Sequence, residues 1–136
     1  MEVATTPAPM AITLDATLSG STSNSYLTMA TAVQIAANMP GGGDWIAADE
    51  ELRNLSLIQA TRWLETLNYN GDRCKASQRL KWPRNGAVCD GVTSDCSGIP
   101  YRIQEAEVAL AIKYNSNPSL FPGGGSGGNA PTGTYV

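Results

Sequence analysis

Apolar residues recur at helical spacing over residues 29–36 and predict a first helix there. Thr28 lies just before this stretch, where its hydroxyl can cap the first turn. The pattern stops at residues 38–43, where a proline and three glycines favour a break in the helix. The apolar side of this helix is formed by Met29, Ala32, Val33, Ile35 and Ala36.

The most regular pattern of the chain predicts a second helix over about residues 49–67. It begins with three acidic residues, which the helix dipole favours in a first turn. Leu55 and Ile58 fall on the polar side of this helix. They are either ordinary exposed apolar residues or a contact with another subunit. The broad apolar side is formed by Leu52, Leu57, Ala60, Thr61, Trp63, Leu64 and Leu67.

A third helix is predicted to open at Ile99 and Pro100 and to run to about Asn115, since proline suits a first helical turn. This helix carries apolar residues on two nearly opposite sides, and both sides have to be covered. We expect one side to meet the other helices of the domain and the other side to meet something else. The first side holds Tyr101, Val108 and Ile112, and the second holds Ile103, Ala106, Leu110 and Tyr114.

The remaining segments have no sustained periodicity. Residues 1–24 are rich in Thr, Ala, Ser and Pro, and residues 68–98 are irregular, with room for a short hairpin near Val88. Residues 116–136 are rich in Gly and Pro, and such a tail becomes ordered only if a neighbouring molecule holds it. The sequence therefore predicts a mainly α fold, a small bundle of about three to four helices over residues 25–115. A long irregular loop interrupts this bundle, and extended N- and C-terminal arms flank it.

Composition narrows the class of protein further. A chain of 136 residues supports one small domain, and nine cations against twelve anions give no global reason to bind nucleic acid. The sequence contains no run of about 18 apolar residues, so no membrane span is expected. The first residues lack the basic start and apolar block of a secretory signal. We therefore expect the protein to be made and kept in a cytoplasm until it is assembled.

The sequence gives little support for a catalytic or metal site. Histidine is absent, which removes every Ser–His or Cys–His pair, and the three glycines before Asp44 lack the lysine of a phosphate-binding loop. Glu105 and Glu107 are two residues apart on a helix, so they point to different sides, and we expect both to be solvated surface carboxylates. No enzymatic activity and no cofactor are expected.

The three cysteines, Cys74, Cys89 and Cys96, include no closely spaced pair of the kind that binds zinc. Cys89 and Cys96 are near enough in sequence to be bridged. In the reducing compartment that we expect, free thiols are favoured instead.

A basic segment stands out against the acidic background. Residues 73–84 contain five of the nine cations, with Trp82 among them and no acid between the first and the last. These cations either contact phosphates or an acidic partner, or form an ordinary solvated loop. We assign Trp82 to the hydrophobic core and leave the role of the cations open. The cations are Arg73, Lys75, Arg79, Lys81 and Arg84.

Several motifs resemble one known family. They are the Ser-Asn-Ser-Tyr-Leu segment at residues 23–27, Trp45, the Leu-Ile-Gln-Ala-Thr-Arg-Trp-Leu segment at residues 57–64, and the Gln-x-Leu-x-Trp-Pro-Arg segment at residues 78–84. Together with Gly91 and the Ile99–Pro100 pair, they resemble phage proteins often described as DnaT-like single-stranded-DNA-binding proteins. The fold and genomic position of those proteins associate them with head-to-tail connector adaptors. The resemblance covers about residues 23–115, and the cysteine-bearing loop departs from the usual short form.

The resemblance implies a structural subunit of the virion, made in the host cytoplasm. Such subunits form a ring, usually of twelve copies, between the portal protein and a tail, nozzle or stopper protein. Genomic DNA passes through the lumen without sequence-specific binding. On this hypothesis the portal would be contacted by Asn117, Pro118, Leu120, Phe121, Pro122, Tyr135 and Val136. Neighbouring subunits would meet at Leu55, Ile58, Ile103, Leu110 and Tyr114.

The alternative is a single-stranded-DNA-binding replication protein that uses the basic segment. Single-strand binders combine a basic groove with aromatic side chains on which successive bases stack. This acidic chain carries its Tyr and Trp residues singly, so the adaptor is the first hypothesis and the DNA binder the second.

Overall fold

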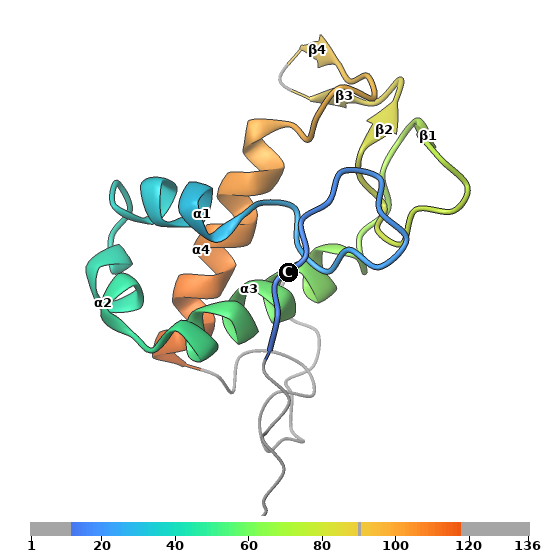
Figure 1. The fold of residues 1–136 in the computed structure, drawn as a ribbon. Coiled ribbons are helices and arrows are strands. Elements are labelled where there is room, and N and C mark those ends of the chain that lie inside the picture. Colours follow the sequence, from blue (N-terminus) through green and yellow to red (C-terminus); the bar gives the residue numbers. More distant parts are fainter. Residues whose placement is uncertain (1–11, 90, 118–136) are drawn as a thin grey trace, which may run out of the picture.

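Helices form most of the regular structure in residues 12–89 and 91–117, the part of the chain that the computed structural model describes (Figure 1). The predicted mainly α fold is confirmed. The helices are α1 (Met29–Ala36), α2 (Gly42–Ala47), α3 (Glu50–Leu64) and α4 (Tyr101–Ser116). The strands are β1 (Asp72–Arg73), β2 (Arg84–Asn85), β3 (Val88–Cys89) and β4 (Val92–Thr93).

The helices pack around α4. α3 has the most extensive contact with α4, and α1 and α2 pack against α4 and against each other. The strands form two antiparallel pairs, in which Asp72 lies opposite Asn85 and Val88 lies opposite Thr93. Both pairs lie beyond the N-terminal end of α4, as Figure 1 shows. The irregular segment between α3 and α4 thus forms a second, non-helical part of the domain.

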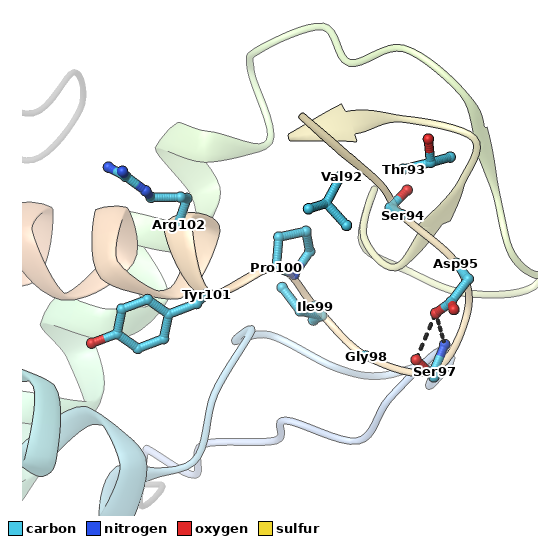
Figure 2. Close-up of a pocket in the computed structure, with 10 residues that line it drawn as sticks. All are labelled: Val92, Thr93, Ser94, Asp95, Ser97, Gly98, Ile99, Pro100, Tyr101 and Arg102. Carbon is cyan, nitrogen blue, oxygen red and sulfur yellow. Dashed lines mark hydrogen bonds between the residues drawn. The ribbon is translucent and has the colours of Figure 1, made fainter. Parts of the chain in front are cut away.

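The predicted helix ends are close to those observed, with one addition. Thr28 caps α1, since its hydroxyl accepts a hydrogen bond from the backbone N–H of Thr31. Pro100 directly precedes α4, as Figure 2 shows. The break after α1 is shorter than predicted, because Gly42 begins the short helix α2. A side chain at Gly42 would lie 1.7 Å from the carbonyl oxygen of Ala36, so only glycine lets α2 approach α1 this closely.

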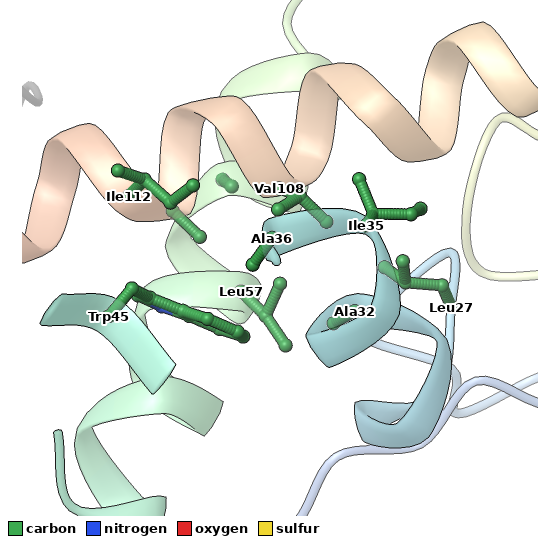
Figure 3. Packing of buried hydrophobic residues seen from close by; sticks show 10 residues of the cluster. Leu27, Ala32, Ile35, Ala36, Trp45, Leu57, Val108 and Ile112 are labelled. Carbon is green, nitrogen blue, oxygen red and sulfur yellow. The ribbon is translucent and has the colours of Figure 1, made fainter. Parts of the chain in front are cut away.

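One hydrophobic cluster fills the space between α1, α2, α3 and α4 (Figure 3). Trp45 lies fully buried in this cluster, and its indole N–H donates a hydrogen bond to the hydroxyl of Ser56 at 2.8 Å. This acceptor offsets the cost of burying the indole N–H. The cluster consists of Leu27, Ala32, Ile35, Ala36, Trp45, Leu57, Ala60, Val108, Ala111 and Ile112.

A second cluster joins the irregular segment to the helices. Trp82 is 4% exposed, and its ring lies edge-on to Tyr69, with the ring centroids 5.2 Å apart. The assignment of Trp82 to the core is therefore confirmed. The buried members of this cluster are Tyr26, Leu64, Leu80, Trp82 and Ala87.

The two apolar sides of α4 are covered mainly by the chain itself, contrary to our expectation. Val108 and Ile112 belong to the first cluster, while Ile103 and Leu110 pack against the second. The irregular segment folds over the second side, which periodicity within the helix could not reveal. Tyr101, predicted on the first side, is 58% exposed, because the first turn of α4 lies beyond the other helices.

The buried side of α3 also differs from the prediction. Leu52 and Leu67, which we placed on the apolar side, are 48% and 37% exposed. Buried polar side chains take part instead. Ser56 accepts the Trp45 N–H, and the amide of Asn54 donates to the backbone carbonyl of Ile12 at 2.9 Å.

The segment before α1 is held on the domain by hydrogen bonds. The side-chain amide of Asn24 donates to the carbonyl of Thr13 at 3.0 Å, and the backbone N–H of Asn24 donates to the carbonyl of Asp15 at 2.8 Å. The bond from Asn54 to Ile12 adds a link to α3. Residues 12–24 therefore follow the surface of the domain.

The prediction of free thiols is wrong for two of the three cysteines. Cys74 and Cys96 form a disulfide, with their Cα atoms 5.7 Å apart. Cys96 therefore pairs with Cys74 and not with Cys89, its neighbour in sequence. The pairing depends on how the loop after β4 folds back on the segment after β1, which residue spacing does not determine.

We predict that replacing Cys74 by Ser lowers the free energy of unfolding by about 3 kcal/mol, because the bond closes a loop over a sequence separation of 22 residues. Urea unfolding under non-reducing conditions measures this loss. Cys89→Ser, which keeps both bonded cysteines, is the control. Equal losses for the two variants would show that Cys74 and Cys96 are not the native pair.

Candidate functional site

The basic segment, residues 73–84, is held together by its own cations. The Arg84 guanidinium donates to four backbone carbonyls, which are those of Asn70 at 2.8 Å, Gly71 at 2.6 Å, Lys81 at 3.1 Å and Tyr69 at 3.3 Å. A guanidinium has five N–H donors in a fixed fork, which suits it to gather several acceptors. Arg84 therefore joins the two sides of the loop and has few donors left for a ligand.

Two further cations of the segment also contact the protein itself. The Lys81 ammonium donates to the carbonyl of Leu67 at 2.7 Å, and an N–H of the Arg73 guanidinium lies 3.5 Å from the carbonyl of Gln78. The Lys81 contact is with the turn that follows α3. The Arg73 contact is long and therefore weak.

Gln78 organises the turn at the centre of the basic segment. Its buried side-chain amide donates to the carbonyls of Leu80 at 2.8 Å and Pro83 at 3.0 Å, and its Oε1 accepts from the backbone N–H of Lys75. The peptide bond between Trp82 and Pro83 is cis. The Gln-x-Leu-x-Trp-Pro-Arg motif is thus accounted for largely by the fold.

Lys75 and Arg79 remain available in the basic segment. Both are exposed, and their side chains make no hydrogen bond with any residue that the structure describes. Arg79 lies on a groove of about 340 Å³ between α3 and the basic segment. The groove is lined by Asn24, Ile58, Thr61, Arg62, Glu65, Arg79 and Leu80.

A second groove, of about 500 Å³, lies where β4 and the following loop meet the start of α4 (Figure 2). Its rim carries Val92, 67% exposed, and Tyr101, 58% exposed, and Ile99 and Pro100 also line it. Val88 of the same hairpin is 65% exposed but does not line the groove. The side chains of large apolar residues are thus unusually exposed around this groove, which we call the apolar groove.

Glu107 is a buried carboxyl that the sequence prediction placed on the surface. It is fully buried on α4, where its Oε2 lies 2.6 Å from the hydroxyl oxygen of Ser25 and its Oε1 accepts the backbone N–H of Tyr26 at 2.9 Å. Its position next to Val108 and four residues before Ala111 puts it on the buried side of the helix. That spacing was the signal that our prediction missed.

Burial raises the pKa of Glu107 to about 7, and hydrogen bonds from the Ser25 hydroxyl and the Tyr26 backbone N–H oppose this shift. The geometry around Ser25 is consistent with a bound proton. Its hydroxyl oxygen lies 2.6 Å from Glu107 Oε2 and 2.8 Å from the carbonyl oxygen of Leu27, and one hydroxyl proton can serve only one of these acceptors. A protonated Glu107 donates to Ser25, whose own proton then goes to Leu27.

Glu107 is connected to the basic segment through Tyr26. The Tyr26 hydroxyl donates to the carboxylate of Glu65, which also accepts the backbone N–H of Lys81 at 2.9 Å. Burial raises the pKa of the Tyr26 phenol, so it remains a donor. The Ser-Asn-Ser-Tyr-Leu motif therefore links α4, α3 and the basic segment.

The predicted contact residues are only partly described. Asn117 caps the C-terminus of α4, and the other predicted portal contacts lie outside the described residues. The predicted subunit contacts, Leu55, Ile58, Ile103, Leu110 and Tyr114, are all half-buried within the chain. They expose less apolar surface than the rim of the apolar groove.

Within residues 12–89 and 91–117, no group of three His, Cys, Asp or Glu side chains is placed to hold a metal ion. None of the described helices is long and apolar enough to cross a membrane.

Comparison with known protein families gives a match. The family model described as "Putative DnaT-like ssDNA binding protein" matches residues 10–130. Neither the curated proteins nor the solved structures gave a match.

We predict that the free energy of unfolding falls by up to about 3 kcal/mol as the pH rises from about 4.5 to 7. In this range folded Glu107 holds a proton that the unfolded chain releases. Glu107→Gln should remove most of this slope, because an amide can donate to Ser25 and accept from Tyr26 as the protonated acid does. Urea unfolding at a series of pH values measures the slope.

Glu105→Gln is the matched control, since it removes one carboxyl from the same helix and leaves Glu107 in place. An unchanged slope in Glu107→Gln would show that the buried carboxyl does not bind the proton.

Proposed function

Since the chain belongs to the family described as putative DnaT-like ssDNA binding proteins, we propose a role for it that combines assembly with the passage of DNA. In this proposal the protein is a head-to-tail adaptor of a tailed phage. Its copies form a ring between the portal protein and the tail, and genomic DNA passes through the lumen. The protein acts by docking and catalyses no reaction.

The exposed apolar groove is the observation that carries this proposal. Val92 and Tyr101, which line the groove, are each more than half exposed, although the domain has two well-formed clusters that bury apolar side chains. Exposed apolar side chains gathered around a groove favour a protein contact. We assign this surface to the neighbouring subunit of the ring, where one face of each copy would meet a different face of the next.

The state of the basic segment agrees with a structural role. Arg84 and Lys81 donate to backbone carbonyls, and Trp82 is buried against Tyr69. Two of the five cations and the aromatic ring that a single-strand binder would use there are therefore engaged by the fold. A net charge of −3 also suits a lumen that DNA crosses without being held.

Single-stranded-DNA binding is the second candidate, because the family description names it. In the basic segment, Lys75 and Arg79 are the two cations whose side chains have no hydrogen-bond partner among the described residues. The two functions predict different defects in a phage that lacks the protein. Loss of an adaptor leaves DNA synthesis intact and stops tail attachment, whereas loss of a replication protein stops DNA synthesis.

We predict that a phage carrying Val92→Asp together with Tyr101→Asp makes DNA-filled heads without tails. A charged carboxylate cannot be buried in an apolar subunit contact without a large cost. Electron microscopy of the particles and the yield of phage DNA per cell are the measurements. Leu52→Asp is the control, because Leu52 is 48% exposed on α3, away from the groove. Normal tails in the double variant would rule out the groove as a subunit contact, and absent DNA synthesis would favour the second candidate.

For the second candidate, we expect binding to an oligothymidylate at low salt, measured by fluorescence anisotropy. If several phosphates are contacted, the logarithm of the affinity falls with the logarithm of the salt concentration by about 0.7 per phosphate. A protein that shows no binding at low salt is not a single-strand binder.

A further inference from the structure

Two arginines of the family motifs differ from the other cations of those motifs in their contacts. Arg62 lies in the motif at residues 57–64, and Arg79 lies in the motif at residues 78–84. Both side chains are exposed, and neither makes a hydrogen bond with a described residue. By contrast, Arg84 and Lys81 in the same motifs donate to backbone carbonyls. The fold therefore gives no reason for an arginine at positions 62 and 79.

The fold brings these two arginines to one place. Both line the groove of about 340 Å³ between α3 and the basic segment, although they are 17 positions apart in the sequence. α3 presents Arg62, and the turn organised by Gln78 presents Arg79. The backbone N–H of Arg79 also donates to the carbonyl of Gly20 at 3.0 Å, which fixes the turn against the segment before α1.

The other polar groups that line the groove are engaged. The amide of Asn24 donates to Thr13 and accepts the backbone N–H of Asp15, and the hydroxyl of Thr61 donates to the carbonyl of Leu57. The carboxylate of Glu65 accepts from the Tyr26 hydroxyl and from the backbone N–H of Lys81. The two guanidinium groups are thus the side chains of this groove that remain available for a ligand.

We propose that Arg62 and Arg79 bind the phosphodiester backbone of a nucleic acid strand in this groove. A guanidinium binds two phosphate oxygens at once through parallel N–H donors, and two such groups can hold adjacent phosphates or one phosphate between them. The charged residues that line the groove are Arg62, Arg79 and Glu65, which together carry a net charge of +1. No aromatic side chain lines the groove, so contact is with the strand's backbone and does not depend on base sequence.

This inference rests on the second candidate function, that the protein contacts nucleic acid. It differs from the sequence prediction in the residues that it uses. Arg62 lies outside the basic segment, and Lys75, Lys81, Arg73 and Arg84 are not required.

The test is fluorescence anisotropy of a labelled oligothymidylate with the full-length protein. We expect Arg62→Ala and Arg79→Ala each to weaken binding about tenfold at low salt, since a charged contact to phosphate is lost. Each should also lower the slope of affinity against salt by about 0.7. Lys75→Ala is the matched control, because it removes an exposed cation of the same loop that does not line the groove. Thermal unfolding of each variant checks that the fold is kept.

Each outcome decides a separate point. An equal loss in Lys75→Ala, or wild-type affinity in both arginine variants, overturns the groove as the site while leaving nucleic acid binding in place. Absence of binding by the wild-type protein overturns the groove and the second candidate together, and leaves the adaptor proposal untouched. Displacement of the oligonucleotide by a glutamate oligomer of equal charge, at equal concentration, would assign the groove to an acidic protein instead.

Discussion

The buried carboxyl of Glu107 is the contact on which the arrangement of the other parts depends. It accepts a hydrogen bond from the backbone N–H of Tyr26 and lies within hydrogen-bond distance of the Ser25 hydroxyl. The segment before α1 is therefore fixed to the middle of α4. The Tyr26 hydroxyl donates a hydrogen bond to the carboxylate of Glu65, which also accepts the backbone N–H of Lys81. Because a polar group in a core is costly unless it is satisfied, this chain of bonds leaves the domain few alternative arrangements. Both grooves lie on parts of the molecule that it positions.

Structural features that depend on residues close together in the sequence were predictable. The Thr28 cap, the helices α1, α3 and α4 and the burial of Trp82 follow from spacing and residue type, whereas α2 was not predicted. The disulfide between Cys74 and Cys96 and the burial of Glu107 depend on contacts between distant segments, and both predictions were wrong. The fold of the site was therefore less predictable than the fold of the helices. Placing Arg62 beside the basic segment also required the structure, since no pattern in the sequence joins α3 to that turn.

The basic segment shows why a local excess of cations is a weak guide to function. Its charge density suggests a nucleic acid contact, yet Arg84 and Lys81 serve as internal hydrogen-bond donors for carbonyls that no strand or helix satisfies. A loop with little regular structure has many such carbonyls, and long cationic side chains can satisfy them. The surface offers instead two separate features to a partner, an apolar groove near α4 and a pair of arginines near α3. This division is compatible with a protein that touches both protein and DNA.

The disulfide has a mechanical consequence. The non-helical part of the domain contains only two-residue strands, and such short ladders would separate early if a partner pulled on them. Because β2, β3 and β4 lie within the loop that the bond from Cys74 to Cys96 closes, tension between α3 and α4 passes through this bond and bypasses both strand pairs. Under load, this part of the domain should therefore yield as one unit rather than strand by strand.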